Sequence, residues 1–338
     1  MLTGKLRELT FREAVSEALQ QEMRRDKRVF LMGEDLQTFF GGGPMGVTPK
    51  EKFVDVFGVE RVRDTPISEA AFIGAATTAA ATGLKPVVEL MCVDFFGVAM
   101  DQIYNQAAKL RYMFGGQVKV PLVIRTTIGG GLSFAAHHSQ CLYSIFAHVP
   151  GLKVVVPSMP YDAKGLLTTA IRGDDPVMFF EHKVLYPFKG PVPDGEYLVP
   201  FGQADVKRSG EDVTIVATAM MVHKALAAAK KLDAEGIQAE IVDPRTIVPL
   251  DKKTILESVK KTGKLVVVDE DYERCGFAAE VAAVVAGEGF EYLDAPIGRV
   301  ATPNVPIPFA PVLEKHVLPN EDSIIRAVKE CIQPRRVT

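Results

Sequence analysis

Short apolar runs alternate with longer stretches of helical pattern along most of this chain. In the first half, the strand-like segments are residues 29–32, 61–64, 86–91, 122–126, 153–156 and 177–181, and the helical ones are residues 11–25, 69–82, 98–113 and 162–172. Strands that are apolar throughout are typical of a parallel sheet covered on both faces. The alternation of strand and helix therefore predicts an α/β fold.

A segment rich in proline and glycine interrupts this alternation. Residues 186–200 read YPFKGPVPDGEYLVP, which is the composition of a linker. The alternation then restarts, with strands predicted at 213–217, 239–242 and 265–268, helices at 222–234, 251–261 and 277–286, and an extended segment at 292–301. A length of 338 residues suits two domains. We therefore predict one domain at residues 1–190, a linker at 191–205 and a smaller domain at 206–338.

The composition is that of a globular protein without the basic surface typical of nucleic-acid binding. Hydrophobic residues make up 47% and charged residues 24%, and the net charge is −3. A mean hydropathy of +0.12 suits either a large core or a surface buried in a permanent complex. The four cysteines are far apart, which favours reduced thiols over disulfides or a zinc site. We expect a cytoplasmic protein that binds neither nucleic acid nor a membrane, because we find no secretory-signal or membrane-spanning pattern.

Two glycine-rich segments are predicted loops. Residues 41–46 read GGGPMG, and the glycines at 129–131 lead into AAHHSQ at 135–140. Glycine clusters let the backbone approach a ligand or another chain closely, but they are equally typical of a plain surface loop. Neither segment has the spacing of a nucleotide-phosphate loop. We expect both loops to be mobile when the chain is alone.

Glu69 stands between a predicted strand and a predicted helix of small apolar residues. Either Ser68 or Thr65 can cap that helix, and an acidic first turn suits the helix dipole. An ordinary first-turn carboxylate is therefore one interpretation. The helix AAFIGAATTAAATG has so little polar character that we also expect it to be deeply buried, and burial raises the pKa of a carboxylate toward neutrality. Glu69 is therefore a candidate proton donor.

His137 and His138 lie in the second glycine-rich segment. A loop imidazole beside glycine and serine is a plausible acid or base near neutral pH, and a solvated loop histidine is the plain alternative. The sequence has no nucleophile elbow and no spacing typical of a metal-binding cluster. These residues alone do not name a reaction.

Several strings, in this order and spacing, resemble one family. They include DTPISEA at 64–70, GLKPVVELM at 83–91, DQIYNQAAKLRYMFGGQ at 101–117, HSQ at 138–140, PGLKVVVPSMPYDAKGLL at 150–167 and DPRTIVPLD at 243–251. The chain resembles the beta subunit of the decarboxylating, thiamine-diphosphate-dependent component of 2-oxoacid dehydrogenase complexes over nearly its whole length. RYMFGGQ at 111–117, DAPIGRV at 294–300 and PNVPIPFAPVLE at 303–314 are more similar to the acetoin dehydrogenase branch than to the pyruvate or branched-chain branches.

The resemblance implies a transketolase-like fold and a catalytic site shared with another subunit. In this family a pyrimidine-binding domain precedes a smaller C-terminal domain, and thiamine diphosphate lies between an alpha and a beta subunit. The alpha subunit holds the diphosphate through magnesium and a GDG motif, which this sequence lacks. The implied partners are therefore an alpha subunit in an alpha2beta2 heterotetramer, a second beta subunit, and a lipoyl-bearing acyltransferase core.

The resemblance also assigns roles to single residues. Glu69 matches the glutamate that hydrogen-bonds the aminopyrimidine ring of the cofactor and so helps to activate it. Phe95 matches the aromatic residue that packs against this ring, with ordinary core packing as the alternative, and Ile67 would line the same pocket. His138 matches the active-site histidine, which acts on the substrate or during transfer to the lipoyl arm.

A potassium ion is a further candidate. Members of the family often hold a monovalent cation through main-chain oxygens. The matching positions here are Leu122, Ala170, Ile171, Gly173 and Asp175. The loop that contains the last two differs from the more acidic or amide-rich versions in other members.

The implied reaction has two forms. The enzyme would cleave acetoin or decarboxylate a 2-oxoacid, and would then transfer the acyl unit to lipoamide. The alternatives are a branched-chain 2-oxoacid dehydrogenase beta subunit, a self-sufficient transketolase-type enzyme and a non-catalytic docking scaffold. The missing GDG motif argues against the second alternative, and the presence of both Glu69 and His138 argues against the third.

Overall fold

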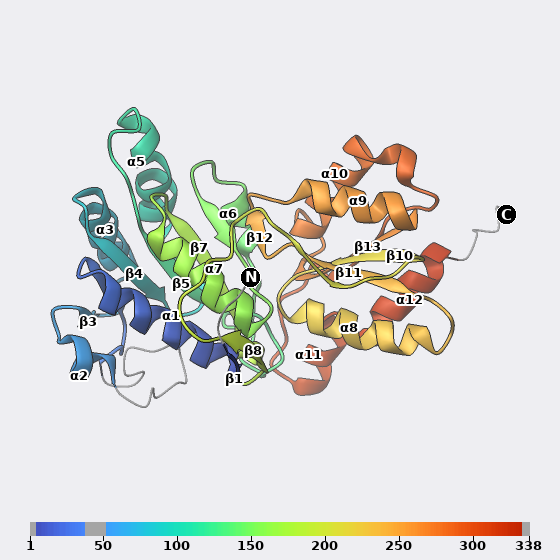
Figure 1. The fold of residues 1–338 in the computed structure, drawn as a ribbon, viewed down its shortest axis with the longest axis horizontal. Helices are drawn as coiled ribbons and strands as arrows, with labels where there is room; N and C mark the ends of the chain where they lie inside the picture. The colour runs from blue at the N-terminus through green and yellow to red at the C-terminus, as the bar shows by residue number, and fades with distance from the viewer. Residues whose placement is uncertain (1–4, 38–51, 333–338) are drawn as a thin grey trace. The chain divides into compact units, whose positions relative to one another are not determined.

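The chain forms two compact units (Figure 1). The computed structural model describes residues 5–37 and 52–332, so the glycine-rich segment 41–46 lies outside the described residues. The first unit comprises Met1–Ile128 and Ile145–Phe201, and the second comprises Gly129–Ser144 and Gly202–Thr338. The chain passes from the first unit to the second at Phe201, inside the predicted linker.

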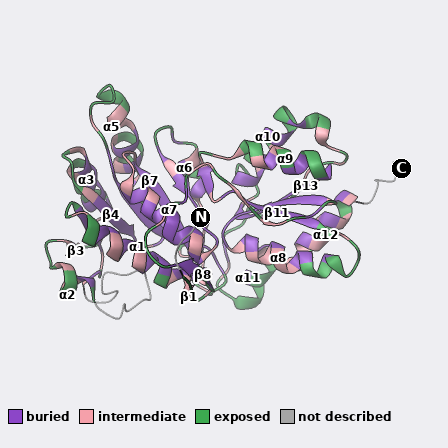
Figure 2. Cartoon of the chain, viewed as in Figure 1, coloured by how far each residue is buried: buried purple, intermediate pink, exposed green. Residues whose placement is uncertain are grey.

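A parallel sheet forms the centre of the first unit. Its strands are β2 (Val29–Gly33), β3 (Val62–Asp64), β4 (Lys85–Leu90), β5 (Val123–Ile128), β6 (Lys153–Val155) and β7 (Val177–His182). They lie in the order β6-β7-β5-β4-β2-β3, and each neighbouring pair is parallel. Every residue of β5 and β7 is buried, as the purple strands in Figure 2 show. The predicted α/β fold with a covered parallel sheet is confirmed.

Helices cover this sheet. They are α1 (Phe11–Arg25), α2 (Phe53–Phe57), α3 (Glu69–Ala81), α4 (Phe96–Asp101), α5 (Ala108–Met113) and α7 (Pro160–Arg172), while α6 (Tyr143–Ala147) begins in the segment assigned to the second unit. A capping box starts α1, in which Thr10 and Glu13 bond each other's backbone N–H. Figure 1 shows α1 and α7 side by side, in contact with each other.

The helix predicted at 98–113 is divided. Its middle turn is a π-helix, η2 (Gln102–Ala107), between α4 and α5. A π-turn adds only one residue to the spacing of a helical pattern, so apolar periodicity does not reveal it. The α3 helix packs against α4 and η2.

The beginning of the predicted linker at 191–205 is instead part of a β-strand in a short antiparallel pair. β1 (Leu6–Thr10) pairs with β8 (Lys189–Pro193), which follows the 3-10 turn η3 (Lys183–Leu185). Proline is tolerated in such an edge strand, although the composition of the segment is typical of a linker. The pairing partner is at the other end of the unit's sequence, so no local pattern indicates it.

A second sheet forms the centre of the second unit. Its strands are β9 (Asp205–Arg208), β10 (Val213–Ala217), β11 (Ala239–Asp243), β13 (Leu265–Tyr272) and β14 (Gly298–Thr302), in the order β14-β13-β10-β11-β9. Only β9 runs antiparallel to its neighbour in this sheet. The remaining elements are α8 (Met220–Asp233), β12 (Thr246–Val248), α9 (Lys252–Thr262), α10 (Phe277–Glu288), η4 (Phe290–Tyr292), α11 (Pro311–Val317) and α12 (Glu321–Ile332). Figure 1 shows α9 and α10 on one face of the sheet and α8 and α12 on the other.

The segment Gly129–Ser144 belongs to the second unit, whereas we predicted it within a domain at 1–190. Its hydrogen bonds explain the difference, because its backbone N–H groups and Tyr143 bond to carboxylates of β13 and α11. Long-range bonds of this kind leave no periodic signal in the sequence.

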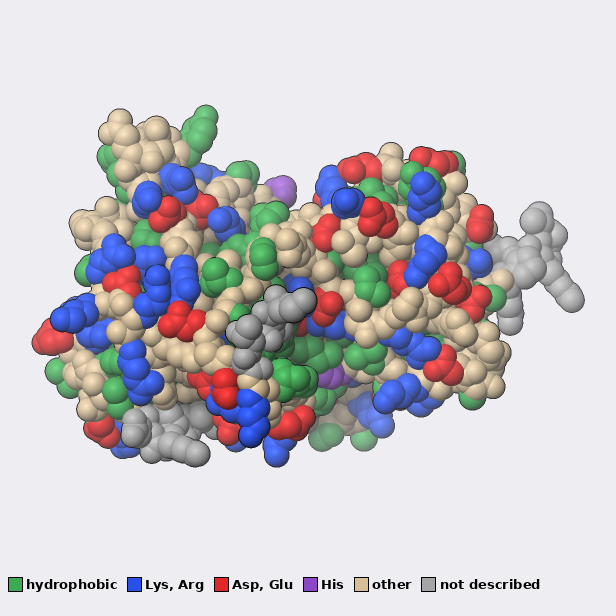
Figure 3. Space-filling view, viewed as in Figure 1, with side chains coloured by type: hydrophobic (Ala, Val, Ile, Leu, Met, Phe, Trp, Pro, Cys, Tyr) green, Lys and Arg blue, Asp and Glu red, His purple; other side chains and the backbone are tan. Residues whose placement is uncertain are grey.

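Charges of both signs are interspersed on the molecular face that Figure 3 shows. This face agrees with the small net charge of −3 and has no extended basic patch. Across the described ranges, no helix combines the length and the apolar character that crossing a membrane requires.

Candidate active site

The candidate residues of the first unit follow the carboxyl ends of parallel strands. Glu69 follows β3 as the first residue of α3, and Phe95 ends the 3-10 turn η1 (Val93–Phe95) after β4. The strands β3, β2 and β4 are neighbours and run parallel, so their carboxyl ends, and both residues, lie at the same edge of the sheet. In open parallel sheets, ligands bind beyond this edge.

Glu69 is a buried carboxylate, with only 8% of its surface exposed. Among the described residues, it has no hydrogen-bonding or ion-pairing partner. Neither predicted cap forms: the Ser68 hydroxyl donates to the Pro66 carbonyl oxygen at 3.1 Å, and the Thr65 hydroxyl oxygen is buried without a partner. Buried carboxylates normally have partners, so this one fits a ligand from outside the described chain.

Glu34 is a residue that the sequence analysis missed. It follows β2 directly, and burial, together with the charges of Glu69 and Asp35, raises the pKa of Glu34. Its Oε1 atom is buried without a hydrogen-bond partner. The protonated form of Glu34 is therefore favoured at this edge. The signal was present, because an acid directly after a buried strand ending in glycine is at the ligand-binding edge of a parallel sheet.

The apolar candidates differ in their exposure. Phe95 is half-buried, whereas Ile67, between β3 and α3, is 83% exposed. A pocket lined by Ile67 would therefore need atoms from outside the described chain to close it.

The α3 helix corrects our expectation of a deeply buried helix. One face is buried and carries Phe72 and Ile73, but Ala71 and Ala75 on another side are exposed. A helix without a polar face is normally covered all round. The exposed small residues therefore suit close approach by another chain.

A buried ion cluster joins the strands beneath this edge. Arg125 on β5 donates to both carboxylate oxygens of Glu181 at 2.7 and 3.1 Å, and to Glu89 on β4 at 3.0 Å. The Tyr186 hydroxyl also donates to Glu181, at 3.0 Å. Burial opposes the charge on Arg125, but the two carboxylates outweigh it and hold its pKa above the ordinary value. The cluster ties β4, β5 and β7 together behind the candidate site.

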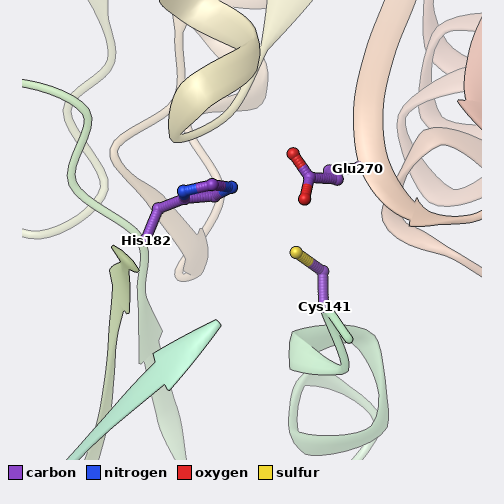
Figure 4. A group of neighbouring side chains, drawn as sticks. All are labelled: Cys141, His182 and Glu270. Atoms are coloured by element: carbon purple, nitrogen blue, oxygen red, sulfur yellow. The ribbon is translucent and has the colours of Figure 1, made fainter. Parts of the chain in front are cut away.

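His138 lies in the second unit, so the two predicted catalytic residues come from different units. It is half-buried, and its Nδ1 lies 3.3 Å from Nδ1 of the exposed His137. Farther along this segment, the thiol of Cys141 points toward the carboxylate of Glu270, with the two ligand atoms within 4.8 Å (Figure 4). Figure 4 also labels His182, the last residue of β7 in the first unit.

A residue near the end of β13, Asp269, forms a hydrogen bond with Tyr143, the first residue of α6. Asp269 is fully buried and accepts hydrogen bonds from the hydroxyls of Tyr143 and Thr218, the latter at 3.1 Å. Burial, followed by the charge of Asp269, raises the pKa of Asp271 to about 7. One oxygen of Asp271 accepts from the Tyr272 N–H at 2.7 Å, and Ser144 also interacts with this carboxylate.

The candidate potassium ligands at the end of α7 are engaged by protein cations. The Ile171 carbonyl oxygen accepts a hydrogen bond from Lys85 Nζ at 2.8 Å. The Asp175 carboxylate pairs with Lys153 at 2.8 Å and with Arg111. Burial alone would raise the pKa of Asp175, but these two cations hold it below the ordinary value.

The other candidate oxygens also have protein donors. The Leu122 carbonyl accepts from the Val177 N–H at 2.9 Å, and the Ala170 carbonyl accepts from the Gly173 N–H at 3.2 Å. A potassium ion would add another positive charge beside three protein cations, and Coulomb repulsion opposes that. The Lys85 ammonium at the Ile171 carbonyl therefore opposes a potassium ion at this position.

Comparisons with known proteins agree with this arrangement. Residues 7–189 match the transketolase pyrimidine-binding domain and residues 202–324 match the transketolase C-terminal domain. A solved structure, an inactive beta4 tetramer of a split-gene transketolase, has a TM-score of 0.76 at 24% identity and covers 96% of this chain and 98% of that one. This likeness bears on the fold alone.

Three relatives match at much higher identity. The beta subunit of acetoin:2,6-dichlorophenolindophenol oxidoreductase is 49% identical in Bacillus subtilis (96% of this chain and 98% of the relative) and 50% identical in Cupriavidus necator (97% and 98%). The beta subunit of the pyruvate dehydrogenase E1 component of Rickettsia felis is 47% identical, over 96% of this chain and 98% of the relative. The chain belongs to the family of dehydrogenase beta subunits that are built from these two transketolase domains and include those of the acetoin and pyruvate dehydrogenases.

Proposed function

We propose that this chain is the beta subunit of a thiamine-diphosphate-dependent dehydrogenase that acts on acetoin or a 2-oxoacid and transfers the acyl unit to lipoamide. The observation that carries the proposal is Glu69, a buried carboxylate at the carboxyl edge of a parallel sheet without a partner among the described residues. A nitrogen heterocycle that shares a proton with a carboxyl group would satisfy it.

The chain's own residues have separate tasks in this proposal. When bound, thiamine diphosphate supplies a carbon nucleophile that adds to the substrate carbonyl. Glu69 would share a proton with the ring nitrogen of the aminopyrimidine, beside Glu34, whose pKa is raised by burial and by the charge of Glu69. Phe95 and Ile67 would provide apolar contacts to the ring. His138 would hold or move a proton at the substrate oxygen.

The overall reaction balances with lipoamide as the oxidant. Acetoin and the lipoamide disulfide would give acetaldehyde and S-acetyldihydrolipoamide. The bond between the two oxygen-bearing carbons breaks, the retained carbon is oxidised to a thioester, and the disulfide is reduced. With pyruvate, carbon dioxide would leave in place of acetaldehyde. The relatives of 49% and 50% identity favour acetoin over pyruvate as the substrate.

An alpha subunit would complete the site. The sequence has no GDG motif to hold magnesium and diphosphate, so these would be bound by alpha. The exposed Ile67 and the exposed small residues of α3 suit contact with a partner chain. We propose an alpha2beta2 heterotetramer with beta–beta contacts, which docks on a lipoyl-bearing acyltransferase core.

The test is turnover of the co-expressed alpha and beta chains with thiamine diphosphate, magnesium and an artificial electron acceptor. Acetoin, pyruvate and a branched 2-oxoacid are compared, and each chain is assayed alone. We expect turnover only in the mixture, and the preferred substrate then identifies the branch. Glu69→Gln should lower turnover by about a hundredfold or more, whereas the exposed control Glu60→Gln should retain it.

Three outcomes would reject the proposal. Turnover by this chain alone would indicate a self-sufficient enzyme. Full turnover by an assembled Glu69→Gln complex would indicate a docking scaffold. Absence of turnover with every substrate in a correctly assembled complex would exclude the dehydrogenase function.

A further inference from the structure

The segment that carries His138 has an unusual backbone. Every second residue from 129 to 135 has a positive φ: Gly129 at 94°, Gly131 at 96°, Ser133 at 58° and Ala135 at 64°. Serine and alanine rarely adopt this conformation, so the segment is strained and needs compensating contacts. Alternation of this kind turns successive N–H groups toward one side, where they form a concave binding site for an anion.

Two carboxylates of the same unit occupy this concave site. The Gly130 N–H donates to Glu270 at 2.7 Å and the Gly131 N–H donates to Glu314 at 2.8 Å. The Ser133 N–H donates to the second oxygen of Glu314 at 3.0 Å, and its hydroxyl donates to that oxygen at 3.3 Å. Glu314 is only 4% exposed, so these charge-assisted bonds are largely shielded from water.

At Gly130 the backbone packs so closely against α11 that a side chain would not fit without a shift. A Cβ atom at Gly130 would lie 2.9 Å from Leu318 and 3.4 Å from Glu314, so the backbone is in direct contact with the end of α11. Gly131 and Ser133 also border a groove of about 1050 Å³, which Glu314 and other residues of α11 line. The segment therefore has space to relax if the carboxylate releases it.

We propose that Glu314 is a positioning residue for His138. It neutralises the concave site and holds the strained backbone that precedes the histidine, so that the imidazole is presented in one orientation. This inference rests on the proposed function for the role of His138, but the anchoring itself does not.

Glu314→Gln tests the anchor with little change in size. An amide has one acceptor oxygen, so its NH2 group would face an N–H of the segment and at least one bond would be lost. Glu291→Gln is the matched control, since Glu291 is exposed on the same unit.

The first readout does not depend on turnover. In the full chain labelled at its six histidines, the ring signal of His138 is assigned through His138→Gln and followed by NMR. We expect Glu314→Gln to shift or broaden this signal and to speed amide exchange in residues 129–140 by about tenfold or more. The control should change neither. An unchanged His138 signal and unchanged exchange would overturn the proposal.

The second readout is turnover with the alpha subunit. We expect Glu314→Gln to lower kcat by about tenfold with little change in KM, and to cause no further loss in a His138→Gln background. If Glu314→Gln lowered kcat equally in the unmodified chain and in the His138→Gln background, the positioning role would be overturned. A general structural defect lowers kcat whether or not His138 is present. If the unmodified complex has no turnover, the proposed function fails, whereas the NMR result still decides whether Glu314 positions His138.

Discussion

Replacing Asp271 by asparagine should stabilise the second unit, and the gain should increase with pH. Asp271 is 4% exposed and lies near the fully buried Asp269. Burial and the charge of Asp269 raise its pKa to about 7, from an ordinary value of 3.8. An asparagine can keep the 2.7 Å bond from the Tyr272 N–H through its amide oxygen, and it carries no charge to bury near Asp269.

The sign follows from proton binding in the two states. The unfolded chain loses the Asp271 proton near pH 3.8, whereas the folded unit keeps it until about pH 7. Between these values the folded state binds more protons, so stability falls as pH rises, and above pH 7 the full penalty is present. At about 1.4 kcal/mol per pKa unit, the penalty is about 4 kcal/mol at pH 8 and about 2 kcal/mol at pH 5.

Scanning calorimetry at pH 5 and pH 8 measures the difference. For a unit of this size, about 4 kcal/mol corresponds to an increase in Tm of about 8 to 16 °C at pH 8, and about half of that at pH 5. Asp322→Asn is the control, because this α12 side chain is 92% exposed and should change Tm by little at either pH. A gain independent of pH, or a loss at pH 8, would refute the reasoning, since it would mean that Asp271 is not ionised against its surroundings.

Three further predictions concern the first unit. Glu69→Gln should lower kcat by about a hundredfold or more without changing assembly, which turnover and analytical ultracentrifugation measure together; unchanged turnover would contradict the role of this carboxylate. Arg125→Met should cost about 3–5 kcal/mol in urea unfolding, because Glu89 and Glu181 would remain buried without their cation, and a loss below about 1 kcal/mol would argue against the buried cluster. Exchanging potassium for sodium at constant ionic strength should change neither turnover nor Tm, because Lys85 already donates to the Ile171 carbonyl. Higher turnover or a higher Tm in potassium than in sodium would contradict this and would indicate a potassium site.

Much of the fold could be predicted locally. Apolar runs such as residues 122–124 and 265–268 indicate strands covered on both faces, because such runs would expose apolar side chains anywhere else. The structure has strands at both places. The position of Glu69 after a strand and before an apolar helix was also visible, since strand ends and helix starts have local signals.

Other features required the tertiary structure. The pairing of β1 with β8, the π-turn η2 and the assignment of Gly129–Ser144 to the second unit depend on contacts between distant segments. The effect of Asp269 on the pKa of Asp271 also became visible only in the folded structure, because burial of both groups produces it.

The sequence by itself determined the class of fold, the order of its elements and the family, because these depend on periodicity and on motifs read along the chain. Only the tertiary structure decided which groups meet. Lys85 at the Ile171 carbonyl and Glu314 at the Ser133 N–H are pairs far apart in sequence. The free energy of such a pair depends on distance and on exclusion of water, and both exist only after the chain has folded.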